Sequence, residues 1–510
     1  MAGTLDDAKI TEYFRNKSVL ITGATGFLGK ILVEKILRVQ PDVKRIYLPL
    51  RAADSAAAKQ RVESEVFGKE LFGLLREFHG AGFDAFVKEK VVALAGDVTC
   101  EGFGVCAETL QELRLNDELN VIINGAATTN FYERYNLEVK HMCDFARTCH
   151  NLEVLVHVST AYVAGDKQGL VLERPFRDGE TLRNGTHLDV DAELRLPRDI
   201  DADNCMDPSP KARRMAMKDL GLTRARQFGW PNTYVFTKSM GEMMLGQMMR
   251  GGNVPFVIVR PSIITSIHND PLPGWIEGPR TIDAILIGYA KQNLPCFLAD
   301  LNLTMDVMPG DMVVNAIMAA TVAHASSFRL LESEKPQQQL LSFPVAPSRL
   351  YHVTSSLRHP APYAVLYKTG IQYFEKHPRV GPNGCPVRTR KVRFLGSMRA
   401  FHLFMLLKYR LPLEFLRLLS LLCCGHFGLA ALYHDLSRNY RFVMQLVDLY
   451  GPFSLFKGFF EDVNLNRLRL SMTDDHNGAS GLFNFDPKTV EWEDYFYRVH
   501  IPGVMKYILK

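Results

Sequence analysis

The sequence predicts an α/β protein built on a doubly wound parallel sheet, followed by a smaller and mainly helical C-terminal domain. Six short apolar runs recur through the first half of the chain, with helical patterns between them. A glycine-rich loop directly follows the first run, where a parallel strand would turn into a helix. After about residue 390 the pattern changes to apolar and aromatic stretches. We therefore expect one domain over residues 1–385 and a second over residues 390–510.

The six apolar runs are short and end at polar or small residues. Such runs are typical of strands that are buried on both faces of a parallel sheet. They span residues 19–21, 45–50, 91–94, 121–123, 154–158 and 255–259. In this architecture ligands bind beyond the carboxyl ends of the strands, so the residues just after each run are the candidates for a binding site.

The loop after the first run has the spacing of a phosphate-binding turn. Glycines permit a tight turn and close approach of a phosphate to the backbone, and the following helix N-terminus supplies N–H groups and a positive dipole end. This context, typical of a Rossmann fold, predicts a dinucleotide site, although such a loop can also be only a turn. The expected cofactor contacts in it are Thr22, Gly23, Thr25, Gly26, Phe27, Leu28 and Gly29.

Arg51 follows the second run and indicates which dinucleotide binds. An acidic residue at this point would bind the ribose 2′-hydroxyl of NAD, whereas an arginine suits the 2′-phosphate of NADP. A solvated arginine is the alternative interpretation. The other residues expected at the cofactor share this position just beyond a strand. They are Asp97, Val98, Asn124, Ala126, Pro261 and Ser262.

Tyr234 and Lys238 lie four residues apart and would share one face of a helix. An ammonium beside a phenol lowers the phenol pKa, so the tyrosine can donate a proton to a carbonyl oxygen near neutral pH. We expect both to contact the cofactor as well, with the lysine on the nicotinamide ribose. An ordinary packed or solvated pair is the alternative. Together with the glycine loop, the pair predicts a nicotinamide-dependent carbonyl reductase.

Two hydroxyl residues, Ser159 and Thr160, end the fifth run. A hydroxyl there can hydrogen-bond a substrate carbonyl oxygen beside the Tyr234 phenol. Thr160 is the better placed of the two, and Ser159 is the second candidate. His157, within the same run, is expected to be a packed histidine rather than a catalyst.

Two segments of the first domain lack the strand pattern and are expected on the substrate side. Residues 165–230 are charged and punctuated by proline and glycine, which is typical of an insertion or a lid. Residues 265–310 include a second irregular stretch, 271–280, that could line a substrate pocket. The apolar stretch 418–433 is short for a membrane span. It predicts either packed helices or a surface that enters a bilayer interface, and we favour these two possibilities over a true membrane span.

Composition excludes several classes of function. The 510 residues are 47% hydrophobic and carry a formal charge of +5, with basic residues scattered along the chain, so we expect no nucleic-acid partner. Nine cysteines lack paired CxxC spacings, so we expect no metal site and a reducing, cytosol-facing compartment. The N-terminus resembles neither a secretory signal nor a plastid transit peptide.

Several longer motifs together resemble one enzyme family. The first domain contains TGATGFLG, GDVT, NGAATTNFYERY, VSTAYV, WPNTYVFTKSMGEM, RPSIITS and PGWIEG, and the tail contains LYGPFSLFKGFFEDVN, FNFDPKTVEWEDYF and VHIPGVMKYILK. These resemble plant-type, alcohol-forming fatty acyl-CoA reductases, which are extended short-chain dehydrogenase/reductases. The glycine loop and the Tyr-Lys pair are shared by many reductases, whereas WPNTYVFTKSMGE and the tail are far more specific.

The resemblance implies two-step reduction of a long-chain acyl-CoA to a primary alcohol by NADPH, with release of CoA. Tyr234 and Thr160 would stabilise the developing oxyanion. It further implies a role in wax, suberin or pollen-wall lipid, with peripheral attachment to the endoplasmic reticulum; a cytoplasmic location is the alternative. Three other activities stay open: reduction that stops at the aldehyde, a nucleotide-sugar epimerase or dehydratase, and an NADPH-binding but inactive paralogue.

One departure from the family motivates the inactive alternative. Family members usually have a longer stretch between the Glu-Arg-Tyr segment and the following Lys-His helix, with an asparagine that helps hold the catalytic lysine through a water. Here residues 135–141 run straight through, shorter by about two helical turns. Asn136 could replace the missing asparagine only if the helix changes register.

Overall fold

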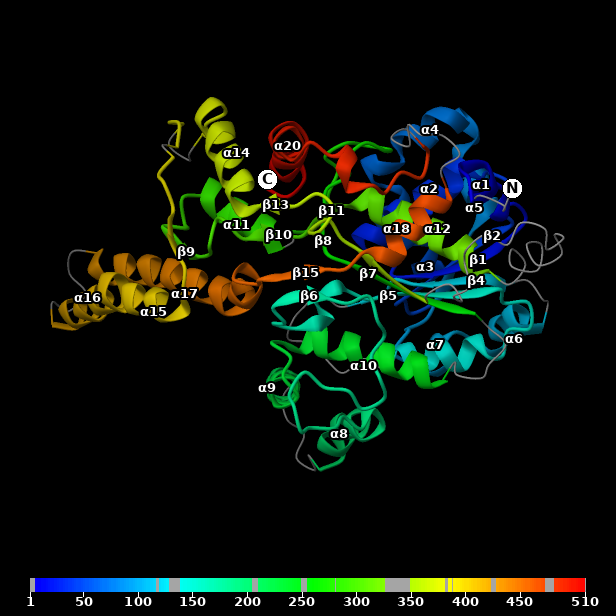
Figure 1. Ribbon diagram of the computed structural model, residues 1–510, viewed down its shortest axis with the longest axis horizontal. Coiled ribbons are helices and arrows are strands. Elements are labelled where there is room, and N and C mark those ends of the chain that lie inside the picture. Colours follow the sequence, from blue (N-terminus) through cyan, green and yellow to red (C-terminus); the bar gives the residue numbers. More distant parts are fainter. Residues whose placement is uncertain are drawn as a thin grey trace.

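The computed structural model describes residues 5–115, 119–127, 138–203, 210–248, 255–279, 281–325, 349–380, 384–387, 389–422, 428–472 and 481–509. Its centre is a seven-stranded parallel sheet (Figure 1). In spatial order the strands are β12 (Leu350–Val353), β7 (Phe256–Pro261), β5 (Val154–Val158), β4 (Leu119–Asn124), β1 (Ser18–Thr22), β2 (Arg45–Leu50) and β3 (Val91–Ala95). The α/β class and the parallel Rossmann sheet predicted from the sequence are confirmed.

Helices cover both faces of this sheet, as its apolar strands require. One face packs against α2 (Phe27–Val39) and α12 (Gly310–His324), and the other faces α7 (Glu138–Ala146) and α10 (Thr233–Met248) (Figure 1). Alternate side chains of a strand therefore enter different cores: Val19 and Ile21 lie in one buried cluster and Leu20 in the other. Around the rim lie α1 (Asp7–Tyr13), α3 (Ser55–Arg61), α4 (Gly73–His79), α5 (Phe83–Lys90) and α6 (Ala107–Leu115).

The strand order reverses at β1, which pairs with β2 on one side and β4 on the other. Helical connections leave opposite faces at such a point, so a crevice opens beyond the carboxyl ends of the two strands. The register aligns Thr22 with Asn124 at this crevice. The glycine loop and the residues after β4 are thus neighbours, as their positions after strands predicted.

The strand at one edge, β12, was not among the six runs predicted from the sequence. It has only four residues, Leu-Tyr-His-Val, and all are buried. Its register with β7 pairs His352 with Arg260. A run this short carries too little periodicity to be distinguished from a loop, and its pairing partner lies about ninety residues away in the sequence.

The two segments that the sequence predicts on the substrate side form small sheets and helices beside the main sheet. The first holds β6 (Gly169–Val171), α8 (Val190–Asp203) and α9 (Pro210–Gln227), which lie next to α10 (Figure 1). The second segment, residues 265–310, holds α11 (Thr281–Ala290), β9 (Cys296–Leu298), β10 (Thr304–Met305) and β11 (Val307–Pro309). The strand β8 (Ile263–Thr265) directly precedes it, and β13 (Ala361–Pro362) and α14 (Tyr363–Lys376) follow later in the chain.

The C-terminal region is mainly helical, yet it adds strands to the first domain. The strand β14 (Arg393–Leu395) pairs with β9, and β15 (Gly458–Phe460) pairs with β6. The helices are α15 (Met398–Met405), α16 (Leu411–Leu422), α17 (Leu429–Ser454), α18 (Val463–Ser471), α19 (Trp492–Asp494) and α20 (Ile501–Tyr507). Because of this interleaving, a domain boundary near residue 390 stays a prediction.

Buried polar contacts hold the closing segment of the chain on the first domain. The Tyr495 hydroxyl lies 2.7 Å from the Thr265 hydroxyl and 2.8 Å from the Ser266 carbonyl oxygen. His500 Nε2 lies 3.0 Å from a carboxylate oxygen of Asp283, and both side chains are fully buried. The tail is therefore part of the same folded core and not an appendage.

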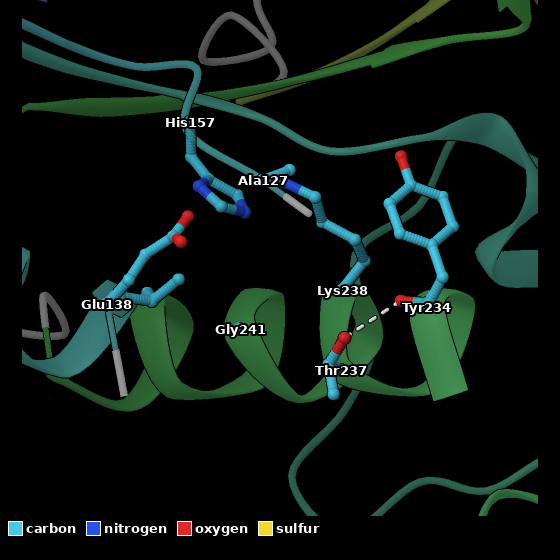
Figure 2. Close-up of a pocket in the computed structure, with 8 residues that line it drawn as sticks. Ala127, Glu138, His157, Tyr234, Thr237, Lys238 and Gly241 are labelled. Carbon is cyan, nitrogen blue, oxygen red and sulfur yellow. Dashed lines mark hydrogen bonds between the residues drawn. The ribbon is translucent and has the colours of Figure 1, made fainter. Parts of the chain in front are cut away.

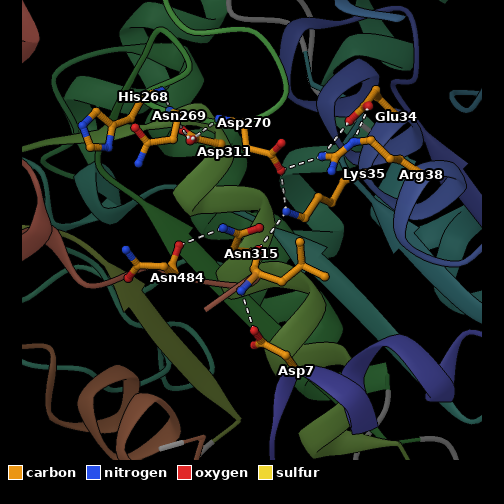
Figure 3. A network of polar contacts seen from close by, with 11 residues as sticks. Asp7, Glu34, Lys35, Arg38, His268, Asn269, Asp270, Asp311, Asn315 and Asn484 are labelled. Atoms are coloured by element: carbon orange, nitrogen blue, oxygen red, sulfur yellow. Dashed lines mark hydrogen bonds and ion pairs between the residues drawn. The ribbon is translucent and has the colours of Figure 1, made fainter. Parts of the chain in front are cut away.

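A second polar network ties the same region to α2 and α12 (Figure 3). Asp270 pairs with Lys35 at 2.8 Å and with Arg38 at 2.6 Å. Asn315 donates a hydrogen bond to the carbonyl oxygen of Asn484 at 2.7 Å. Asp311 accepts from the backbone N–H groups of residues 268–270. These contacts fix the loop before α11 beside the glycine-loop helix.

Candidate active site

The glycine loop makes a close approach to the residues after β4. Gly23 has a φ of +75°, and a Cβ there would lie 2.8 Å from the Ala126 Cα. A Cβ at Gly29 would lie 2.4 Å from the Gly23 carbonyl oxygen. A side chain at Gly23 would force the loop away from the residues after β4, and one at Gly29 would force the first turn of α2 away from the loop. Packing therefore requires glycine at both positions, and the positive φ requires it at Gly23 as well.

The helix that follows this loop has an N-terminus open to an anion. Gly26 precedes α2 and has no side chain that could cap the first N–H groups of the helix. The first N–H groups of a helix have no intrahelical acceptor, and they lie at the positive end of its dipole. The Thr22 hydroxyl accepts from the Ala126 N–H at 3.0 Å and donates to Asn124 Oδ1 at 2.7 Å, which fixes the loop. The cradle therefore fits the pyrophosphate of a dinucleotide.

The stretch from residue 271, which the sequence suggested for the substrate pocket, contacts the helix after the glycine loop. The indole of Trp275 stacks on Phe27 with 5.3 Å between ring centroids. Glu277 pairs with the buried ammonium of Lys30, which also donates to the Thr25 carbonyl oxygen at 2.6 Å. This stretch thus stabilises the first turn of α2, and its lining of a substrate pocket remains untested.

The other expected cofactor residues lie at the carboxyl ends of the strands. Arg51 directly follows β2 and is exposed, and its side chain has no ionic partner among the described residues. The nearby Arg61 pairs with Glu65 at 2.6 Å instead. Asp97 accepts from the backbone N–H of Thr99 at 2.9 Å. Val98, Pro261 and Ser262 lie just beyond or at the ends of β3 and β7.

Tyr234 and Lys238 lie one turn apart on α10 and project toward β5 (Figure 2). Asn232 caps this helix by accepting from the Val235 N–H at 3.1 Å. The Lys238 ammonium is buried and donates to the Val158 carbonyl oxygen at 2.8 Å, whereas Tyr234 is half-buried. The helix thus fixes the ammonium at the carboxyl end of β5 and leaves Tyr234 partly exposed.

A buried carboxyl group, Glu138, shares a pocket with this pair. The pocket is lined by Ala127, Glu138, Val139, His157, Tyr234, Thr237, Lys238 and Gly241 (Figure 2). Burial lowers the pKa of Lys238, and the charges of Glu138 and Glu242 oppose that shift. Burial likewise raises the pKa of Glu138 to about 7, and Lys238 opposes it. Each charge therefore stabilises the other in a site with little water.

His157 lines the same pocket but does not carry a charge at neutral pH. Burial, and then the charge of Lys238, lower its pKa well below the usual value. Its Nδ1 lies 3.2 Å from Asn124 Nδ2. A neutral ring at this position fills space and hydrogen-bonds, as a packed histidine does.

The next turn of α10 carries a second buried carboxylate, Glu242. It pairs with Arg260 of β7, whose Nε lies 2.9 Å from Oε1, and it accepts from the Ser159 hydroxyl at 2.5 Å. The Ser159 hydroxyl therefore donates its hydrogen bond to a carboxylate that also pairs with Arg260. Thr160 makes only a 3.4 Å contact with the Pro261 carbonyl oxygen and a 3.3 Å contact with the Tyr162 N–H. The Thr160 hydroxyl is thus held by longer contacts than the Ser159 hydroxyl.

Glu138 and Glu242 were absent from the residues proposed on sequence grounds. A signal for Glu242 existed, because Tyr234, Lys238 and Glu242 repeat every four residues and so share one face of a helix. No comparable signal marks Glu138, since its place beside Lys238 depends on the packing of α7 against α10. Asn136, the suggested substitute for the missing asparagine, lies outside the described residues.

Aromatic residues of the C-terminal region pack directly behind the hydroxyl segment. The ring of Tyr162 makes edge-to-face contacts with Phe453, Phe456 and Phe460 at 5.3 to 5.8 Å. On the other side, the Trp230 indole donates to the Val163 carbonyl oxygen at 2.8 Å. The position of residues 159–163 is thus set jointly by the C-terminal region and by the segment that precedes α10.

Comparison with known proteins identifies the family. Two family models described as "Male sterility protein" match, an NAD-binding one over residues 21–317 and a C-terminal one, named Sterile, over residues 408–510. Fatty acyl-CoA reductase 1 of Arabidopsis thaliana is 42% identical over 99% of this chain and 100% of its own length. The chain belongs to the fatty acyl-CoA reductase family.

Two further comparisons agree with this family and its fold. The alcohol-forming fatty acyl-CoA reductase of Simmondsia chinensis is 42% identical over 98% of this chain and 99% of its own length. The reductase domain of a Mycobacterium tuberculosis non-ribosomal peptide synthetase superposes with a TM-score of 0.56 at 15% identity, covering 99% of this chain and 96% of its own. The resemblance seen in the sequence motifs is confirmed, and so is a nicotinamide-nucleotide cofactor.

We predict that Glu138→Gln shifts the pH dependence of the reaction. Because the carboxylate favours the charged form of Lys238, its removal lowers the pKa of that ammonium further. The alkaline limb of kcat/KM against pH should then move about one unit toward lower pH. Asp144→Asn is the matched control, since Asp144 lies on the same helix and its side chain is 46% exposed. An unchanged alkaline limb, or an equal shift in the control, would contradict this role.

We predict that Arg51→Glu discriminates between the two nicotinamide dinucleotides. Loss of a charge-assisted contact with the 2′-phosphate should raise the KM for NADPH about tenfold or more and change the KM for NADH far less. Arg45→Glu is the control, because Arg45 is exposed at the opposite end of the same strand. Equal changes in both KM values would remove Arg51 from this role.

Proposed function

We propose that this protein reduces long-chain fatty acyl-CoA to a primary alcohol with NADPH and releases CoA. The observation that carries the proposal is the buried Lys238 ammonium beside Tyr234, at the carboxyl end of β5 and across from a glycine cradle that fits a dinucleotide. The family supports the substrate class, since the relatives that match over the full length are named fatty acyl-CoA reductases.

The proposed roles of the side chains follow from their positions. The bound cofactor supplies the hydride. The Tyr234 phenol donates a proton to the oxygen of the carbonyl under attack, and the Lys238 ammonium stabilises the phenolate that is left. The Thr160 hydroxyl donates a hydrogen bond to the same oxygen. These roles serve two successive reductions, each of which consumes one hydride and one proton. The first converts the thioester to a hemithioacetal, which releases CoA as the free thiol and leaves the aldehyde. The second, with a second molecule of the cofactor, converts the aldehyde to the alcohol.

We propose NADPH rather than NADH because Arg51 offers an exposed cation just after β2. Glycine loop residues 22–29, Asp97, Val98, Asn124, Ala126, Pro261 and Ser262 are proposed to complete the cofactor site. We further propose that the protein is a peripheral membrane protein of the endoplasmic reticulum, facing the cytosol. Within the described parts of the chain, every helix falls short of the length or apolarity needed to cross a bilayer.

An active enzyme is favoured over an inactive paralogue by the polar partners of Lys238. Residues 135–137 of the segment that is shortened relative to the family lie outside the described residues, and residues 138–141 form the start of α7. The residue that begins α7, Glu138, nevertheless interacts electrostatically with the ammonium. A carboxylate thus supports the lysine from the element that would have carried the asparagine.

The test is expression in yeast followed by gas chromatography of the neutral lipids. We expect new long-chain primary alcohols, reduced about 100-fold or more in Tyr234→Phe, because the variant lacks the proton donor. Tyr367→Phe, a tyrosine of α14 distant in sequence from the site, should leave the yield unchanged. Aldehydes in place of alcohols would show that reduction stops halfway, and no product from well-expressed protein would contradict the proposal.

A further inference from the structure

A helical arm projects from the body of the molecule (Figure 1). We define the arm as the described residues of 391–441, in which β14 at the base is followed by α15, the π-helical turn Leu406–Arg410, α16, and α17 as far as Arg441. Its helices α16 and α17 pack against each other, but α16 contains no buried residue over its twelve positions. One side of this helix pair therefore faces away from the remainder of the described chain.

The exposed side of the arm is strongly apolar. Ten of the twenty large hydrophobic side chains that are exposed in the described chain fall between residues 403 and 436. Six of them repeat every three or four residues along consecutive helical segments, so they form one stripe. The stripe consists of Leu403, Leu407, Leu411, Phe415, Leu418 and Leu422, which are between 52% and 78% exposed. Soluble monomers rarely expose so continuous an apolar surface.

The arm also carries the excess positive charge of the whole protein. Residues 391–441 contain eight lysines and arginines but only two acidic residues, whereas the entire chain has a formal charge of +5. The rest of the chain is therefore close to neutral, and the even scatter of basic residues expected from the sequence does not hold here. The eight basic residues, all exposed, are Lys391, Arg393, Arg399, Lys408, Arg410, Arg417, Arg438 and Arg441.

Few of these cations are neutralised by the protein itself. The two acidic residues of the arm, Glu414 and Asp435, pair with Arg417 and Arg438 at 3.6 Å and 3.0 Å. The remaining six basic residues have no carboxylate partner among the described residues. An apolar stripe bordered by unpaired cations is complementary to a surface that is apolar beneath a layer of negative charge.

We propose that the arm docks on a lipid bilayer containing anionic phospholipids, with the leucine and phenylalanine stripe at the acyl boundary and the basic residues among the headgroups. A functional reason for this membrane contact, which rests on the proposed function, is the difference in polarity between substrate and product. The substrate carries a charged CoA group, whereas a long-chain alcohol has none and leaves water for a bilayer. The arm would hold the active site next to the bilayer, into which the long-chain alcohol partitions.

A second copy of this chain is the competing occupant of the stripe, and the charges argue against it. Two arms meeting along their stripes would bring together two sets of unpaired cations at short range. Like charges facing each other across an interface oppose association, whereas an anionic bilayer attracts both the cations and the apolar side chains.

The proposal is tested by flotation of the purified full-length protein with vesicles. We expect binding to vesicles of phosphatidylcholine mixed with phosphatidylserine, weaker binding to phosphatidylcholine alone, and loss of that difference in high salt. The variant Leu407→Gln/Phe415→Gln/Leu418→Gln should bind these vesicles at least about tenfold more weakly. The variant Arg399→Gln/Lys408→Gln/Arg410→Gln should lose the preference for the anionic lipid.

The control variant is Phe78→Gln/Leu357→Gln/Val463→Gln, which removes three exposed apolar side chains from other surfaces and should bind like the unsubstituted protein. Equal binding by the stripe variant and this control would overturn the proposal. So would sedimentation of the lipid-free protein as a dimer that only the stripe variant converts to a monomer, because the stripe would then be an interface between copies.

The outcome is separable from that of the proposed function. Flotation requires no catalysis, so a protein that fails to reduce acyl-CoA can still show or refute lipid binding. Reduction of a short, water-soluble acyl-CoA, followed by NADPH absorbance, reports the active site by itself. We expect the stripe variant to retain this activity while it loses vesicle binding.

Discussion

The main physical constraint on the site is that the buried ammonium of Lys238 must stay charged. Removing a cation from water is costly unless hydrogen bonds and opposite charges replace the solvent. Here the Val158 carbonyl oxygen accepts from the ammonium directly, and Glu138 and Glu242 favour its charge. The helix that carries it must therefore be fixed in register with β5, and several features of the fold serve that purpose.

Glu242 links the position of this helix to the sheet. It binds Arg260 on β7 and the hydroxyl of Ser159 at the end of β5, so the helix is tied to two adjacent strands. Asn232 caps the start of the helix, and Trp230 bonds the segment that follows Thr160. The C-terminal aromatic residues then close over Tyr162. The tail and the end of the 165–230 segment thus help set the positions of Thr160, Tyr234 and Lys238.

Features set by residues close together in the sequence could be predicted from the sequence. Features set by contacts between residues far apart in the sequence could not. The strands β1 to β5 and β7 were predictable because each is a local apolar run. The glycine loop was predictable because a strand, a tight turn and a helix follow one another in a short stretch of sequence. The four-residue spacing placed Tyr234 and Lys238 on one face for the same reason. By contrast, Glu138 lies beside Lys238 only because α7 packs on α10, and β12 is a strand only because β7 pairs with it. The pairing of β14 and β15 with strands of the first domain is likewise invisible to local periodicity.

The proposed reaction requires one site to perform two successive reductions. The measurement that tests it is the ratio of NADPH oxidised to CoA released when purified protein consumes a limiting amount of a long-chain acyl-CoA. Two NADPH per CoA, with the alcohol as the final product, is the result we predict. A ratio of one, with aldehyde accumulating, would contradict the account and show a site that releases its product after the first reduction.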